Sequence, residues 1–139
     1  MGPYRIPNLT LLSSLVGKPA VIPPTDEGGT VQCVGLLKYY NPLIGSTRTW
    51  TKGADVSDTP AILSGTAIAT FIDGVYPSHA HGNHACYFIR FLDDDSGFTV
   101  LEQHVRPHPN LIQTRDIKYG GNHPNDSVSN DGDAYSIIL

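Results

Sequence analysis

The chain has 139 residues, a formal net charge of −4 and a hydrophobic share of 40%. This length predicts a single domain over residues 1–139. Its hydrophobic share is that of a folded protein, far from the composition of disordered chains. Only nine Lys and Arg residues are scattered along this acidic chain. That distribution argues against nucleic-acid and anionic-membrane partners, which require clustered positive charge.

Targeting segments are not evident in the sequence pattern. No apolar run approaches the roughly 20 residues of a bilayer-spanning helix, so membrane insertion is not expected. Met1 to Lys18 lacks the basic start and the cleavage pattern of a signal peptide. A role outside the cytoplasm would therefore require removal of a leader or a secretion route that needs none.

Two helices are predicted in the first third of the chain. Asn8 to Val16 predicts a short helix that Gly17 ends. Val31 to Tyr40 predicts a second helix, because its apolar residues recur at three- and four-residue spacing. Thr30 is the expected N-cap of this second helix, which puts Cys33 at its third position.

Antiparallel strands dominate the rest of the prediction. The expected strands are Thr66 to Phe71, Ala85 to Leu92, Phe98 to Val105, Ile112 to Tyr119 and Ala134 to Leu139. Asp93 to Gly97 predicts a hairpin turn, and Gly120 to Asp133 predicts a surface loop. The polar stretch after the second helix is expected to be a loop. This order favours an α+β fold, in which N-terminal helices pack on one face of a curved antiparallel sheet.

Cys33 is the candidate nucleophile. A thiol at a helix N-terminus lies beside unsatisfied N–H groups and the positive end of the helix dipole, and both favour the thiolate. Gly28 and Gly29 leave room for a ligand to approach the backbone. The alternative is a purely structural role, in which Cys33 is a small buried hydrophobic residue. Cys86 is expected to be a buried free thiol, with a disulfide to Cys33 left open.

A thiolate that cleaves an amide needs an imidazole to protonate the departing amine. His84 is the candidate, because it begins an expected strand at the sheet edge, where a helix N-terminus could meet it. The other imidazole nitrogen needs an acceptor, and Glu102 and Gln103 lie on the next strand. Strand alternation allows only one of them to face His84. Glu102 is preferred and Gln103 remains the alternative, while a solvated edge carboxylate is the competing interpretation of Glu102.

Three residues are expected to contact a substrate: Trp50, Tyr76 and Asn83. Trp50, together with Arg48 and Lys52, could form the wall of a cleft that admits an acidic peptide. A lone Trp is more often part of the core, and that alternative remains open here.

Six short segments carry a family resemblance. They are Thr30–Val34, Gly65–Phe71, Tyr76–His79, Gly82–Ala85, Val100–Gln103 and Asp133–Ile138. Together they resemble small bacterial NlpC-type amidases, which are similar to the CHAP amidases and belong to the papain-like superfamily. Several of these amidases serve as type VI secretion effectors. The resemblance runs from about Thr30 to the C-terminus and is strong between Gly65 and Ala85.

The resemblance implies a papain-like NlpC-type fold, no cofactor, and cleavage of an amide bond in peptidoglycan stem peptides. It implies Cys33 as nucleophile and His84 as base, in the bacterial periplasm or cell wall. An antibacterial effector of this kind also implies an immunity or inhibitor protein as a partner. At one place the chain departs from the pattern: the relatives carry Asp and then Gln at the position of Glu102 and Gln103, followed by Trp where this chain has His104.

A metal-dependent hydrolase is the main alternative. His79, His81 and His84 form the pattern H-x-H-x-x-H, and three imidazoles near a strand could bind zinc or iron. Glu102 would then be the general base. The spacing resembles that of cupins, but the later metal-binding segment of those barrels is not evident.

A second alternative is a catalytically inactive module that keeps the fold and binds cell-wall peptides. Trp50, Tyr76 and Tyr87 would supply its contacts. Such a protein would bind peptidoglycan fragments without releasing products.

Overall fold

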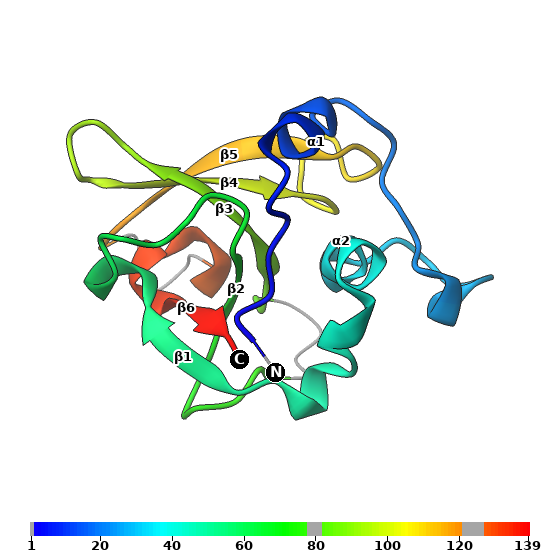
Figure 1. Ribbon diagram of the computed structural model, residues 1–139, viewed down its shortest axis with the longest axis horizontal. Coiled ribbons are helices and arrows are strands. Elements are labelled where there is room, and N and C mark those ends of the chain that lie inside the picture. Colours follow the sequence, from blue (N-terminus) through cyan, green and yellow to red (C-terminus); the bar gives the residue numbers. More distant parts are fainter. Residues whose placement is uncertain (1, 78–81, 121–126) are drawn as a thin grey trace.

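Two α-helices come early in the chain, and a six-stranded sheet follows them (Figure 1). The computed structural model describes residues 2–77, 82–120 and 127–139. Helix α1 spans Leu9–Ser14, and its cap Asn8 accepts a hydrogen bond from the Leu11 N–H at 3.0 Å. Gly17, with φ +84°, follows the helix in the left-handed conformation that glycine adopts without strain. The first predicted helix is therefore confirmed, two residues shorter at its end.

Helix α2 spans Cys33–Tyr40, so it begins later than the sequence predicted. Its N-cap is Gln32, which makes no side-chain cap hydrogen bond, and the Thr30 hydroxyl instead accepts from the Gln32 side chain at 3.1 Å. The expected cap at Thr30 is wrong, because the chain is still extended through Gln32. Cys33 is consequently the first residue of the helix rather than the third.

The strands form one antiparallel sheet in the order β1-β6-β2-β3-β4-β5. The strands are β1 Lys52–Asp55, β2 Ala67–Thr70, β3 Ala85–Phe91, β4 Gly97–Glu102, β5 Gln113–Lys118 and β6 Tyr135–Ile138. All five predicted strands are present, and Leu92 and Gly97 close the predicted hairpin with a 3.0 Å hydrogen bond. The α+β prediction is confirmed.

Strand β1 is the element that the sequence did not predict. Its four residues, Lys52 to Asp55, contain no large apolar side chain and alternate between exposed and half-buried. It pairs with β6 at the sheet edge, and Gly53 lies close to β6, since a Cβ there would come within 2.8 Å of the Ile137 carbonyl oxygen. Edge strands of this kind lack the hydrophobic pattern on which strand prediction depends.

Short 3-10 helices connect the main elements. They are η1 Pro24–Asp26, η2 Pro42–Ile44, η3 Thr47–Thr49, η4 Val56–Asp58, η5 Val128–Asn130 and η6 Gly132–Ala134. The last two fall at the end of the predicted surface loop, of which residues 121–126 lie outside the described part of the chain. None of the helices in the described segments has the length and the apolar character that a membrane crossing requires.

Both faces of the sheet are buried. On one face, α1 and α2 cover alternate strand residues such as Ala69, Tyr87 and Leu101. The other face carries a second core cluster, in which Val56 of η4 packs with Cys86, Val100 and several aromatic rings. Helix α2 contacts β3 directly, and the Tyr87 hydroxyl donates to the Asn41 side chain just beyond the helix at 2.6 Å. This packing holds the N-terminus of α2 at the end of the sheet where β3 begins and β4 ends.

Candidate active site

Three separate segments bring Cys33, His84 and Glu102 together. Cys33 is half-buried at the start of α2, His84 directly precedes β3, and Glu102 is the last residue of β4. The backbone of His84 is fixed by Thr70 of β2: the His84 N–H donates to the Thr70 hydroxyl at 3.0 Å, and the Thr70 N–H donates to the His84 carbonyl at 2.9 Å. The imidazole is 4% exposed and Glu102 is fully buried. Cys33 is therefore the most exposed residue of the three.

The three side chains interact in series. His84 Nε2 lies 2.8 Å from Glu102 Oε1, and the imidazole acts on the Cys33 thiol so as to lower its pKa. Because Nε2 faces the carboxylate, Nδ1 is the nitrogen left to act on the sulfur. This is the order of nucleophile, base and orienting group that activates a thiol.

The electrostatics of the site favour the thiolate and the imidazolium. Burial acts to raise the pKa of Cys33, but the hydrogen bond and positive charge of His84 outweigh it, so the pKa of the thiol is lowered. For His84, burial opposes the charged form, but Cys33 and Glu102 overcome it and raise the pKa of the imidazole to about 9. The Ala85 backbone N–H acts in the same direction and lowers the pKa of the thiol further. At neutral pH the site is therefore expected to hold an ion pair ready for nucleophilic attack.

Arg115 belongs to the site, although the sequence analysis did not identify it. Its Nε and Nη2 hold the two oxygens of Glu102 at 2.8 and 3.1 Å, and Nη1 donates to Asn130 Oδ1 at 2.6 Å. Burial acts to raise the pKa of Glu102, but His84 and Arg115 together lower it, so the carboxylate stays ionised. Arg115 lies opposite Val100 in the β4–β5 ladder and reaches Glu102 diagonally. Only the strand register reveals this pair, and the sequence did not predict that register.

Gln103 makes its hydrogen bonds on the other face of the sheet. Its Nε2 donates to the carbonyls of Val21 and Gln32 at 2.9 and 2.7 Å, and its Oε1 accepts from the Val21 N–H at 2.8 Å. The alternative in which Gln103 orients His84 is therefore wrong in this structure. Gln103 instead fixes the segment that leads into Cys33.

Tyr76 lies beside the sulfur, and Asn83 lies beside Tyr76. The Tyr76 hydroxyl oxygen is 3.9 Å from Cys33 Sγ, and Asn83 Nδ2 donates to the same hydroxyl at 3.2 Å. The Tyr76 side chain is buried, whereas Asn83 is half-buried. Tyr76 therefore adjoins the nucleophile, and Asn83 is linked to it through the Tyr76 hydroxyl. The expected contact of these two residues with a substrate stays a prediction.

Trp50 does not line a cleft. Its side chain is 5% exposed, its indole N–H donates to the Ile44 carbonyl at 3.1 Å, and its ring packs on Tyr76 with 5.0 Å between ring centroids. Arg48 and Lys52 are exposed, and Lys52 forms an ion pair with Asp55 at 2.9 Å. The substrate-binding prediction for Trp50 is corrected: the indole is part of the core. Its large apolar area is buried there, and its single N–H donor is hydrogen-bonded.

Replacing Trp50 is expected to affect stability rather than substrate binding. Trp50→Ala should lower the free energy of unfolding by about 3–5 kcal/mol, because it leaves a cavity in the core. Trp50→Phe keeps most of the volume and should cost only about 1–3 kcal/mol, since the Ile44 carbonyl then loses its donor. Urea unfolding measures both costs. A Trp50→Phe variant with unchanged stability and a KM at least tenfold higher would show that the indole does contact substrate.

The metal hypothesis depends partly on residues that the structure does not describe. His79 and His81 lie outside the described residues. Within residues 2–77, 82–120 and 127–139, no three His, Cys, Asp or Glu side chains are arranged to hold a metal ion. His84, the third residue of the motif, directs Nε2 at Glu102, and its pKa is raised by both Cys33 and Glu102. It is therefore engaged in the thiol site in this conformation.

Cys86 is a free thiol inside the core that covers the second face of the sheet. Burial raises its pKa well above that of an ordinary thiol. Cys33 is also free, so the disulfide that the sequence left open is not formed. An inert buried thiol is the expected behaviour of Cys86.

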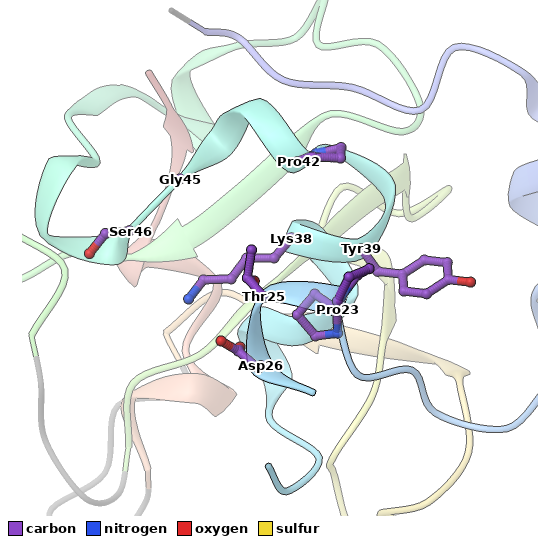
Figure 2. Close-up of a pocket in the computed structure, with 9 residues that line it drawn as sticks. Pro23, Thr25, Asp26, Lys38, Tyr39, Pro42, Gly45 and Ser46 are labelled. Carbon is purple, nitrogen blue, oxygen red and sulfur yellow. The ribbon is translucent and has the colours of Figure 1, made fainter. Parts of the chain in front are cut away.

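A hollow of about 500 Å³ lies between η1 and the second half of α2 (Figure 2). Pro23, Tyr39 and Pro42 contribute apolar walls. In Figure 2 the side chains of Lys38 and Asp26 extend to the same side of it from two different segments. Lys38 lies five residues beyond the thiol, which is roughly 7.5 Å along the helix axis. The hollow is thus a neighbour of the thiol site and shares none of its side chains.

Comparison with known proteins identifies relatives over nearly the whole chain. The family model described as Domesticated amidase effector 2 matches residues 13–138. The chain is 34% identical over 118 residues to the Type VI secretion amidase effector 2 protein of Salmonella typhi, with 80% of this chain and 86% of that protein covered. It is also similar to the solved structure of Type 6 secretion amidase effector 2, with a TM-score of 0.78 and 32% identity, covering 99% of this chain and 94% of the other.

Proposed function

The chain belongs to the Domesticated amidase effector 2 family, and from that membership we propose that it is a cysteine amidase that hydrolyses an amide bond in bacterial peptidoglycan stem peptides. The relatives are named amidase effectors, which supports the reaction class. The observation that carries the proposal is the chain from the Cys33 thiol through His84 to Glu102. A papain-like NlpC-type fold is part of the same proposal.

The first half of the proposed reaction forms an acyl-enzyme. The Cys33 thiolate attacks the amide carbonyl carbon, and the electron pair of the C=O bond moves onto oxygen. The first N–H groups of α2 have no intrahelical partner and can donate to that oxyanion. When the C–N bond breaks, the amine leaves with the proton of His84, and a thioester to Cys33 remains.

The second half releases the product. His84, now neutral, takes a proton from a water molecule that attacks the thioester carbonyl. Collapse of the second oxyanion breaks the C–S bond, and the departing thiolate regains its imidazolium partner. Glu102 stays ionised throughout and fixes the orientation of the ring, while Arg115 holds Glu102 in place.

The site of action follows from the names of the relatives. Both are called type VI secretion effectors. We extend that role to this chain as an antibacterial protein delivered to the periplasm of a target cell. A protein of that kind would have an immunity or inhibitor protein as its partner in the producing cell.

The lowered thiol pKa favours an enzyme over an inactive wall-binding module. A binding module gains nothing from a thiolate that is held against a buried imidazole and a buried carboxylate. Such a constellation is costly to bury and is typical of catalytic sites. The enzyme is therefore the function that the geometry supports best.

Inhibitors separate the cysteine mechanism from the metal alternative. Purified sacculi are digested with the protein, and the released peptides are identified by mass spectrometry. Treatment with iodoacetamide is expected to abolish product release, whereas a chelator such as EDTA should leave it unchanged. The Cys86→Ala variant, in which Cys33 is the remaining thiol, should behave like the wild type in both treatments. Loss of activity with EDTA, or activity that survives full alkylation, would contradict the proposal.

A further inference from the structure

A phenol hydroxyl lies next to the nucleophile, and the thiol–imidazole–carboxylate chain does not use it. Tyr76 is 8% exposed, and its ring is held by Trp50 on one side and by Phe71, with centroids 5.0 and 6.4 Å away. Two aromatic neighbours restrict the ring, so the position of its hydroxyl is fixed by packing. That position is 3.9 Å from Cys33 Sγ, within the range of hydrogen bonds to sulfur.

The partners of the hydroxyl set the direction of its hydrogen bond. Asn83 Nδ2 donates to the Tyr76 oxygen at 3.2 Å. A phenol has one proton, and because its oxygen already accepts from Asn83, that proton is free to point at the sulfur. Burial, followed by the charge of Cys33, raises the pKa of Tyr76 well above its usual value. The hydroxyl therefore stays protonated and remains a donor wherever the Cys33 thiolate exists.

We propose that the Tyr76 hydroxyl is a catalytic hydrogen-bond donor, which stabilises the Cys33 thiolate in the free enzyme and the oxyanion after attack. This proposal deepens the amidase function and rests on it. When the S–C bond forms, negative charge leaves the sulfur and appears on the carbonyl oxygen, two bonds away. A hydroxyl next to the sulfur can donate first to the sulfur and then to that oxygen without any movement of its ring. Tyr76 keeps its proton throughout, and the amine takes its proton from His84.

Asn83 acts through Tyr76 as a positioning residue. Its amide nitrogen fixes the phenol oxygen, while its Oδ1 is buried and has no hydrogen-bond partner in the described part of the chain. A buried carbonyl without a partner is unusual and calls for an explanation. The geometry supplies one: the amide is oriented by the need to donate to Tyr76, at the expense of its own oxygen.

Tyr76→Phe tests the proposal, because it keeps the ring against Trp50 and removes only the hydroxyl. We expect kcat to fall about tenfold to several hundredfold, with KM changed less than about threefold, since a single oxyanion donor acts in the transition state. We also expect the pH midpoint for alkylation of Cys33 by iodoacetamide to shift upward. Asn83→Ala should have a smaller effect of the same kind. The double variant should be no slower than Tyr76→Phe, because both changes remove one interaction.

Tyr87→Phe is the matched control, since Tyr87 is also a buried tyrosine that hydrogen-bonds an asparagine, at 2.6 Å. It should lower the midpoint of urea unfolding and leave the alkylation profile unchanged. A Tyr76→Phe variant with the kcat and alkylation profile of the wild type would overturn the inference, as would independent, additive effects of Asn83→Ala. The two proposals can be tested separately, because the alkylation profile requires no substrate. If the wild type released no peptides but Tyr76→Phe still shifted the pH midpoint of alkylation, only the amidase function would be contradicted.

Discussion

Replacing Cys33 with alanine is expected to stop the release of peptides from purified sacculi, with a rate at least about four orders of magnitude lower. The sulfur is the atom that would form the covalent intermediate, and no other described thiol can replace it, since Cys86 is fully buried in the core. The measurement is a time course of product release by mass spectrometry, with wild type and variant at equal concentration. Removal of the thiol should leave the fold intact, because Cys33 is only half-buried.

Two further variants make this result specific. Cys33→Ser keeps the shape and a hydroxyl, but a hydroxyl ionises far less readily than a thiol, so it should be nearly as inactive as Cys33→Ala. Cys86→Ala removes the other thiol and should retain activity. Equal product release by wild type and Cys33→Ala would exclude the mechanism. A loss of activity in Cys86→Ala without unfolding would show that the wrong thiol has been assigned.

Replacing Glu102 with glutamine should lower kcat/KM by roughly 10²- to 10⁴-fold and narrow the pH range of activity. The ion pair exists above the lowered pKa of Cys33 and below the pKa of His84, which is about 9. The Glu102 charge helps to raise the pKa of His84, so its loss lowers that pKa. The alkaline limb of the pH–rate profile should therefore move to lower pH. A profile of kcat/KM between pH 5 and pH 10 measures the shift.

Asp116→Asn is the matched control for this change. Asp116 is a carboxylate on neighbouring β5 that accepts a hydrogen bond from Thr99 at 2.7 Å, and it does not contact His84. Its replacement should leave both limbs of the profile in place. Glu102→Gln also deprives the half-buried Arg115 of its partner, so urea unfolding must confirm that the variant is folded at the assay temperature. An alkaline limb that stays at its wild-type pH in a folded Glu102→Gln variant would show that Glu102 does not act on the imidazole.

The parts of the fold with a strong local pattern were predictable from the sequence. The buried strands β3 and β4 are apolar runs, and the turn between them at Asp93 to Gly97 has the composition of a hairpin. Period-two alternation also predicted that Glu102 and Gln103 point to opposite faces, which the structure confirms. These features depend on neighbours in the sequence, and local sequence encodes them well.

Features that depend on packing between distant segments were not predictable. Arg115 meets Glu102 only through the β4–β5 register, and the long connection between those strands does not fix that register. The sequence left open whether Trp50 lies in the core or lines a cleft, and only its contacts with Tyr76 and Ile44 show that it lies in the core. Strand β1 exists because β6 offers it a partner. In each case the partner comes from elsewhere in the chain.

Glu102 and Gln103 are adjacent residues, so a single peptide unit positions both the imidazole and the thiol. On one side of β4, Glu102 hydrogen-bonds the His84 imidazole. On the other side, the Gln103 side chain donates to the carbonyl of Gln32, the residue just before Cys33. The positions of the Cys33 sulfur and the His84 imidazole thus both depend on the backbone of residues 102 and 103. Small movements of β4 therefore shift the two groups together and preserve the distance between them. A shift of β4 by one residue would exchange the faces of the two side chains and break both sets of hydrogen bonds. The rate of turnover therefore depends on the register of this strand.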